Sequence, residues 1–174
     1  SSWTQVGGDI DGEAAADGSG MSVSLSSDGS RVAIGASGND GTTGNGSDSR
    51  GHVRVFDYTP SGTSSWTQVG GDIDGEAAID ASGFSISLSS DGTRVAIGAP
   101  NNDGNGSNSG HVRIYDYNGS AWVQVGGDID GEAAGDQSGH SVSLSSDGTR
   151  VAIGANNNDG NGSNSGHVRV YSLS

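Results

Sequence analysis

Cysteine and lysine are absent from this 174-residue chain, which also has only 2 prolines and 5% aromatic residues. Without cysteine the chain offers no disulfide, no thiolate zinc site and no cysteine nucleophile. No apolar run approaches the roughly 18–20 residues of a membrane-spanning helix, so we expect no membrane partner. The 21 acidic residues outnumber the 7 arginines and give a formal net charge of -14. Because phosphate binding needs clustered basic side chains, we expect no nucleic-acid partner.

Glycine is abundant, with 33 residues, and the chain consists of three similar repeats. Trp3, Trp66 and Trp122 fall in register, and most of the residues that follow each of them recur. The repeats span residues 1–58, 59–117 and 118–174. Strand-like segments inside repeats of this length are typical of propeller blades and related arrays. Copies this similar indicate recent duplication or deliberate engineering.

Each repeat contains four short segments in which apolar and small residues alternate, a pattern that predicts β-strands. Asp91-Gly92 lies between the first two segments of the second repeat and is typical of a tight hairpin turn. The only candidate helix, residues 13–16, is about one turn long, so we expect an all-β fold. We name the four segments strands a, b, c and d, which in the second repeat are residues 85–89, 94–99, 111–115 and 66–70.

A sheet built from these strands has bulky side chains on one face and Ser, Ala and Gly on the other. Such a sheet cannot bury its apolar face alone, so the sheets must stack on one another. Large residues of one sheet against small residues of the next favour a β-propeller of four-stranded antiparallel blades, with three blades in the chain. A β-solenoid is the alternative, although its rungs are usually shorter and lack the hairpin of strands a and b.

The second repeat resembles the FG-GAP repeat of integrin α-subunit propellers. Gly83-Phe84 and the triplet Gly98-Ala99-Pro100 carry the resemblance, although Met21 and His140 replace the Phe and Ser37 and Asn156 replace the Pro in the other repeats. The resemblance implies a propeller that often serves adhesion or recognition and holds calcium in the loop between strands a and b. Here those turns, around Asp28, Asp91 and Asp147, are too short to wrap a cation, so we expect the family's usual calcium site to be absent.

The order of strands along the chain is d-abc-d-abc-d-abc, which leaves both ends incomplete. Three blades are fewer than the roughly four to eight of known propellers, so we expect two chains to close a six-bladed ring as a homodimer. Nine blades from three chains, or excision from a longer propeller, are the alternatives. The predicted interface docks the first strand d of one chain beside the last strand c of the other, and comprises Trp3, Thr4, Gln5, Val6, Gly7, His167, Val168, Arg169, Val170 and Tyr171.

Acidic residues concentrate in the loops that lead from strand d to the next strand a. Their alternating carboxylates are the hard oxygen ligands that Ca²⁺ prefers, while the alternative is that they cap turns through their own backbone. No cofactor is required, and Ca²⁺ is the candidate ion. The histidines that begin each strand c, His52, His111 and His167, are either metal ligands or, as we expect, strand-end residues hydrogen-bonded to a turn. The candidate metal ligands are Asp9, Asp11, Glu13, Asp17, Asp72, Asp74, Glu76, Asp80, Asp128, Asp130, Glu132 and Asp136.

These observations favour a module without catalytic activity. Serines are frequent, but none lies in a Gly-x-Ser-x-Gly turn, and repetition argues against one privileged nucleophile. The first hypothesis is a propeller module that self-assembles by strand exchange between chains. The second is an extracellular or cell-surface recognition module, if the chain is native, that binds Ca²⁺ and a glycan or protein ligand on its acidic loop face.

Overall fold

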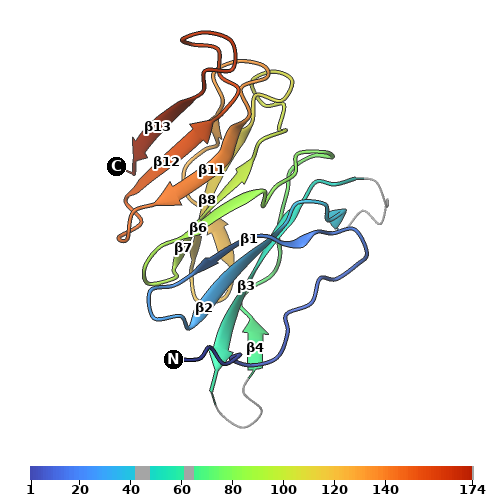
Figure 1. Cartoon of the computed structure of the whole chain (residues 1–174), viewed down its shortest axis with the longest axis vertical. Coiled ribbons are helices and arrows are strands. Elements are labelled where there is room, and N and C mark those ends of the chain that lie inside the picture. The colour runs from blue at the N-terminus through green and yellow to red at the C-terminus, as the bar shows by residue number, and fades with distance from the viewer. Residues whose placement is uncertain (42–47, 61–64, 174) are drawn as a thin grey trace.

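The computed structural model describes residues 1–41, 48–60 and 65–173. Within these residues the regular elements are β-strands, arranged in three antiparallel sheets that lie one after another along the molecule (Figure 1). This confirms the predicted all-β fold and is consistent with consecutive blades of a β-propeller. No helix in the described part of the chain has the length and apolar character needed to cross a membrane.

The first two sheets have the predicted strand order a-b-c-d, and the third contains strands a, b and c. The first sheet comprises β1 (Ser19–Leu25), β2 (Arg31–Ala36), β3 (His52–Thr59), β4 (Ser65–Gln68) and β5 (Ile73–Asp74). The second comprises β6 (Ser85–Leu88), β7 (Arg94–Ala99), β8 (His111–Tyr117), β9 (Trp122–Gln124) and β10 (Ile129–Asp130). The third comprises β11 (Ser138–Leu144), β12 (Arg150–Ala155) and β13 (His167–Ser172).

The outer strand of each complete sheet comes from the following repeat and is divided into two parts. In the first sheet β4 pairs with the second half of β3, and β5 pairs with its first two residues. Gly70 lies between the two parts with a φ of 73°, a left-handed conformation that glycine adopts without steric cost. The sequence predicted strand d over residues 66–70 and did not predict the second part.

The turns between strands a and b are built around an aspartate and a glycine, as predicted. In the second sheet, Oδ1 of Asp91 accepts hydrogen bonds from the Ser89 hydroxyl and from the backbone N–H and hydroxyl of Thr93. Gly92 follows with a φ of 69°. An aspartate that satisfies the backbone of its own turn favours this hairpin before any tertiary contact forms.

The hydrophobic core lies between neighbouring sheets. Ile86 and Leu88 of β6 are buried against Val53 and Val55 of β3, and Val95 and Ile97 belong to the same cluster. A second cluster joins the second and third sheets. Small residues allow this approach, because a Cβ atom on Gly98 would overlap with the carbonyl oxygen of Gly139 in the next sheet. The sheets therefore stack as predicted, with large side chains packed on one another in the core and small residues where the backbones approach most closely.

Candidate functional site

The acidic loops and the loops between strands b and c lie at the same end of the sheets, where hydrogen bonds join them. The acidic segments are residues 9–17, 72–80 and 128–136. The last aspartate of each segment is buried and links the two loops. Asp80 accepts hydrogen bonds from the backbone N–H of Ala77 and from the side-chain amide of Asn102 in the neighbouring loop. Asp17 and Asp136 make the corresponding contacts in the other repeats. These three carboxylates therefore hold the loops together.

The second aspartate of each segment contributes its backbone rather than its carboxylate. The carbonyl oxygen of Asp74 accepts a 2.8 Å hydrogen bond from Nη2 of Arg113, which lies on the next sheet. Asp11 and Asp130 accept the corresponding bonds from Arg54 and Arg169. This position therefore connects the outer strand of one sheet to the central strands of the next.

The two later segments each have two further carboxylates, an aspartate and a glutamate, which lie near the histidines of two different sheets. Glu76 and Asp128, from different acidic segments, each place a carboxylate oxygen near Nδ1 of His111, at 3.8 and 3.9 Å. The histidine is almost completely buried, and this nitrogen has no hydrogen-bond partner. Glu13, His52 and Asp72 form the same group one repeat earlier. In the third repeat Glu132 lies 3.5 Å from Nδ1 of His167.

Burial is the main influence on the central histidine of the second group. It lowers the pKa of His111 below its usual value, and the neighbouring Arg113 guanidinium lowers the pKa further. The carboxylates of Asp128 and Glu76 act in the opposite direction. The neutral imidazole is therefore favoured, with a free lone pair available on one ring nitrogen.

The predicted interface residues occupy two separate places in the single chain. His167, Val168, Arg169, Val170 and Tyr171 lie in β13, and no described strand pairs with its outer edge. Trp3, Thr4, Gln5, Val6 and Gly7 form no strand and lie beside the first sheet, where the Val6 carbonyl accepts a 3.0 Å hydrogen bond from Nε1 of Trp66. The two segments therefore do not meet within the chain.

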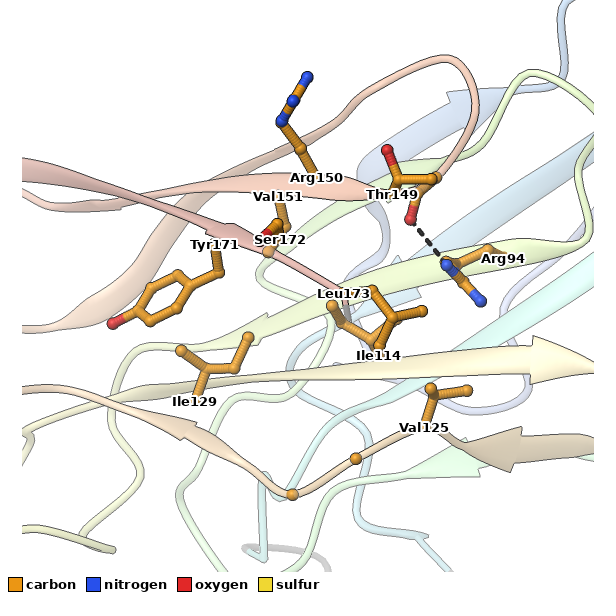
Figure 2. A pocket seen from close by; sticks show the side chains of 13 residues that line it. Arg94, Ile114, Val125, Ile129, Thr149, Arg150, Val151, Tyr171, Ser172 and Leu173 are labelled. Atoms are coloured by element: carbon orange, nitrogen blue, oxygen red, sulfur yellow. Dashed lines mark hydrogen bonds between the residues drawn. The ribbon is translucent and has the colours of Figure 1, made fainter.

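A pocket of about 210 Å³ lies beside β13, between the second and third sheets (Figure 2). Its lining is mainly apolar and includes Ile114, Val125, Ile129, Tyr171 and Leu173, whose side chains surround the opening in Figure 2. Sequence reasoning missed this pocket. The tryptophan that begins each strand d could have indicated it. Trp122 fills the corresponding space between the first two sheets.

Comparison with known proteins supports the repeat assignment. No curated protein matches the chain. The crystal structure of a proposed 6-phosphogluconolactonase from Bacteroides uniformis is similar with a TM-score of 0.55 and 14% identity over 88% of this chain and 36% of that one. Hydrazine synthase from Kuenenia stuttgartiensis gives a TM-score of 0.48 and 13% identity, over 87% of this chain and 44% of that one. The chain thus spans less than half the length of either structure, and the likeness to the first concerns the fold alone.

The family model of the FG-GAP repeat matches the chain twice. One match runs from β5 to β8, and the other runs from β10 to β13. Each match therefore begins at the second part of an outer strand and ends in strand c of the following sheet. Residues 73–115 and 129–171 of this chain are FG-GAP repeats.

Proposed function

We propose that the 174-residue chain is a non-catalytic assembly module in which two copies close a six-bladed propeller. In this dimer the N-terminal arm, defined here as residues 3–17, completes the third sheet of the other copy as its outer strand. The twofold symmetry makes the two junctions equivalent, as in most homodimers. The observation that carries the proposal is a tryptophan-sized pocket that is filled at one junction between sheets and open at the next.

The N-terminal arm makes two of the contacts that the later outer strands make. Nε1 of Trp122 donates a 2.9 Å hydrogen bond to the carbonyl of Val69, as Nε1 of Trp66 does to Val6 in the arm. Farther along, Arg54 binds the carbonyl of Asp11 just as its counterparts bind the later acidic segments. The arm therefore adopts the geometry of the later repeats although no sheet of its own lies beside it.

The pocket beside β13 is the place that a third such tryptophan would fill. A Cβ atom on Gly7 would lie 3.0 Å from Trp66, and one on Gly70 would lie 2.9 Å from Trp122. The equivalent glycine in the pocket wall, Gly126, has nothing within 4 Å. Trp3 is fully exposed in the single chain. We propose that Trp3 of a second copy occupies this pocket.

The exposed apolar faces of the first and third sheets also support binding of a second copy. Val23 and Leu25 of β1 are 65% and 60% exposed, whereas the equivalent Ile86 and Leu88 of β6 are buried at 8% and 7%. At the other end, Val168 and Val170 of β13 are 68% and 65% exposed, while their counterparts in β3 are buried. Paired apolar faces of this kind mark interaction surfaces. In a ring of two copies, the exposed face of the first sheet would pack on the third sheet of the other copy. Both faces would then be buried as the equivalent faces already are between sheets within one chain.

Light scattering on the purified chain tests the assembly. We expect a mass near twice 17.1 kDa. Truncating a tryptophan buried at an interface costs about 2–4 kcal/mol, so Trp3→Ala should raise the dissociation constant on the order of 30-fold or more. Ile79→Ala is the matched control, because Ile79 is an exposed apolar residue outside the arm and the pocket.

The expected control result is an unchanged dimer for Ile79→Ala. A wild-type chain with the mass of one copy at every concentration, or a Trp3→Ala variant that dimerises as strongly as the wild type, would overturn the proposal. A particle of three copies would replace the six-bladed ring with a nine-bladed one.

A further inference from the structure

The second histidine group contains a buried nitrogen for which the described fold provides no hydrogen bond. Nδ1 of His111 is unpaired, and the side chain is 1% exposed. A buried polar atom without a hydrogen-bond partner is destabilising, so such an atom calls for a partner. The nearest charged oxygens belong to Glu76 and Asp128, whose side chains are 43% and 32% exposed and can be reached from solvent. The group therefore combines a buried nitrogen that could ligate a metal with carboxylates that solvent can reach.

Each carboxylate uses one oxygen elsewhere and turns the other toward the histidine. Oε1 of Glu76 lies 3.5 Å from Arg113, while Oε2 faces His111. Oδ1 of Asp128 accepts a 2.7 Å hydrogen bond from Gln124, while Oδ2 faces His111. Supporting contacts of this type orient the ligands of metal sites. The arrangement is thus already restricted before any ion arrives.

The same orientation is present one repeat earlier. Oε2 of Glu13 lies 3.8 Å from Nδ1 of His52, and its other oxygen lies 3.7 Å from Arg54. Oδ1 of Asp72 accepts a 2.7 Å hydrogen bond from Gln68. Each group brings three ligand atoms within 4.8 Å of one another. Independent recurrence of the geometry shows that it follows from the fold and not from one accidental side-chain position.

The donor set selects the kind of ion. One imidazole nitrogen with two carboxylate oxygens suits first-row divalent transition metals, whereas Ca²⁺ takes six to eight oxygen ligands. Metal–ligand distances of about 2.0–2.2 Å place tetrahedral ligand atoms roughly 3.4 Å apart. The nitrogen–oxygen distances of 3.8 and 3.9 Å in the second group therefore need to contract by only a few tenths of an ångström. We propose that each group binds one such ion, with water completing the coordination, and we take Zn²⁺ as the test ion.

A third site would form only between two copies. Glu132 and His167 are in place at the end of the chain, but the residue that corresponds to Asp72 and Asp128 is Asp9 at its beginning. Oδ1 of Asp9 already accepts the matching hydrogen bond from Gln5. This third site rests on the proposed function, whereas the first two lie within one chain. We therefore expect two Zn²⁺ ions per chain in the single-chain fraction and three per chain in the dimer.

Calorimetric titration of the full chain with Zn²⁺, with mass measured on the same samples, tests the proposal. The double variant Asp72→Asn, Asp128→Asn should weaken binding at both sites by tenfold or more. Asp103→Asn with Asp159→Asn is the control, because it removes two charges from the same end of the sheets but from residues outside the groups. We expect the control to bind Zn²⁺ as the wild type does.

A second measurement avoids any variant that fails to fold. The imidazole NMR signals of His52 and His111 should shift on addition of Zn²⁺, while that of His140, whose ring lies tilted against Phe84, should not. Absence of Zn²⁺ binding, equal weakening in both double variants, or a shift confined to His140 would overturn the proposal. Two ions per chain in a sample that never dimerises would support it while refuting the assembly, so the two failures are distinguishable.

Discussion

Replacing Gly98 with alanine tests whether neighbouring sheets are held together by direct backbone contact. The added Cβ would overlap with the carbonyl oxygen of Gly139 in the third sheet and with the hydroxyl of Ser85, which itself donates a 2.7 Å hydrogen bond to that carbonyl. The substitution therefore pushes the two sheets apart and breaks the hydrogen bond. Overpacking of this kind costs about 1–3 kcal/mol, and the lost hydrogen bond adds about 1 kcal/mol.

The chain contains its own control for this substitution. Gly154 is the equivalent residue in the third sheet, but a Cβ there would meet only the side chain and backbone of Ser141, because no further sheet packs on this one among the described residues. The serine hydroxyl has room to rotate away, so we expect Gly154→Ala to cost less than about 1 kcal/mol within a single chain. The same variant should also prevent the proposed dimer, since a second copy would approach at this glycine.

Denaturant unfolding at a concentration where light scattering shows single chains measures both variants. We expect Gly98→Ala to lower the free energy of unfolding by about 3 kcal/mol, which for a domain of this size corresponds to roughly 6–12 °C in melting temperature. A loss below about 1 kcal/mol for Gly98→Ala, or equal losses for the two variants, would refute the claim that the sheets meet through these glycines.

The remaining predictions concern charged side chains. Asp116→Asn removes the two-pronged contact with Arg94 and should cost about 1 kcal/mol in urea unfolding. Ser172→Asp should raise the free energy of unfolding by roughly 0.5–1 kcal/mol, because Ser172 pairs with Arg150 at the position where the earlier repeats have an aspartate. An unchanged free energy of unfolding would contradict this pairing. Hydrogen bonds within its turn lower the pKa of Asp147 to about 2 from 3.8. The ionised carboxylate should therefore stabilise the fold above about pH 4, and this contribution should be lost as the pH falls toward 2. An NMR titration of the carboxyl group measures this pKa.

The strands and their order could be predicted from the sequence because both depend on local patterns. The alternation in residues 94–99 and the Asp91-Gly92 turn fix a hairpin, and β7 has the predicted bounds. The division of the outer strands was not predictable in the same way. The glycine pair at 70–71 is visible in the sequence, but nothing there shows that Trp122 lies against Gly70.

The candidate metal groups illustrate a stronger limit. The sequence places four carboxylates within nine residues and suggests that they act together. In the structure Asp80 is buried in a loop contact, while Glu76 joins Asp128 from the next repeat. This pairing depends on how one sheet stacks on another, which no local pattern encodes. The histidines were noticed as possible metal ligands, but the sequence does not show that Nδ1 of His111 is buried without a hydrogen-bond partner.

The offset between repeats and sheets explains why the proposed assembly and the proposed metal sites use the same segments. Each of the two later acidic segments completes the outer strand of one sheet, supplies an aspartate to the histidine of that sheet, and supplies a glutamate to the histidine of the next. Asp128 and Glu132 show this division, since they lie beside His111 and His167 respectively. Among the described residues no sheet precedes the first segment, and Asp9 joins no histidine group, so in the proposed dimer a second copy would use both. Occupation of the third site should consequently rise with the dimer fraction, since both require the arm of a second copy.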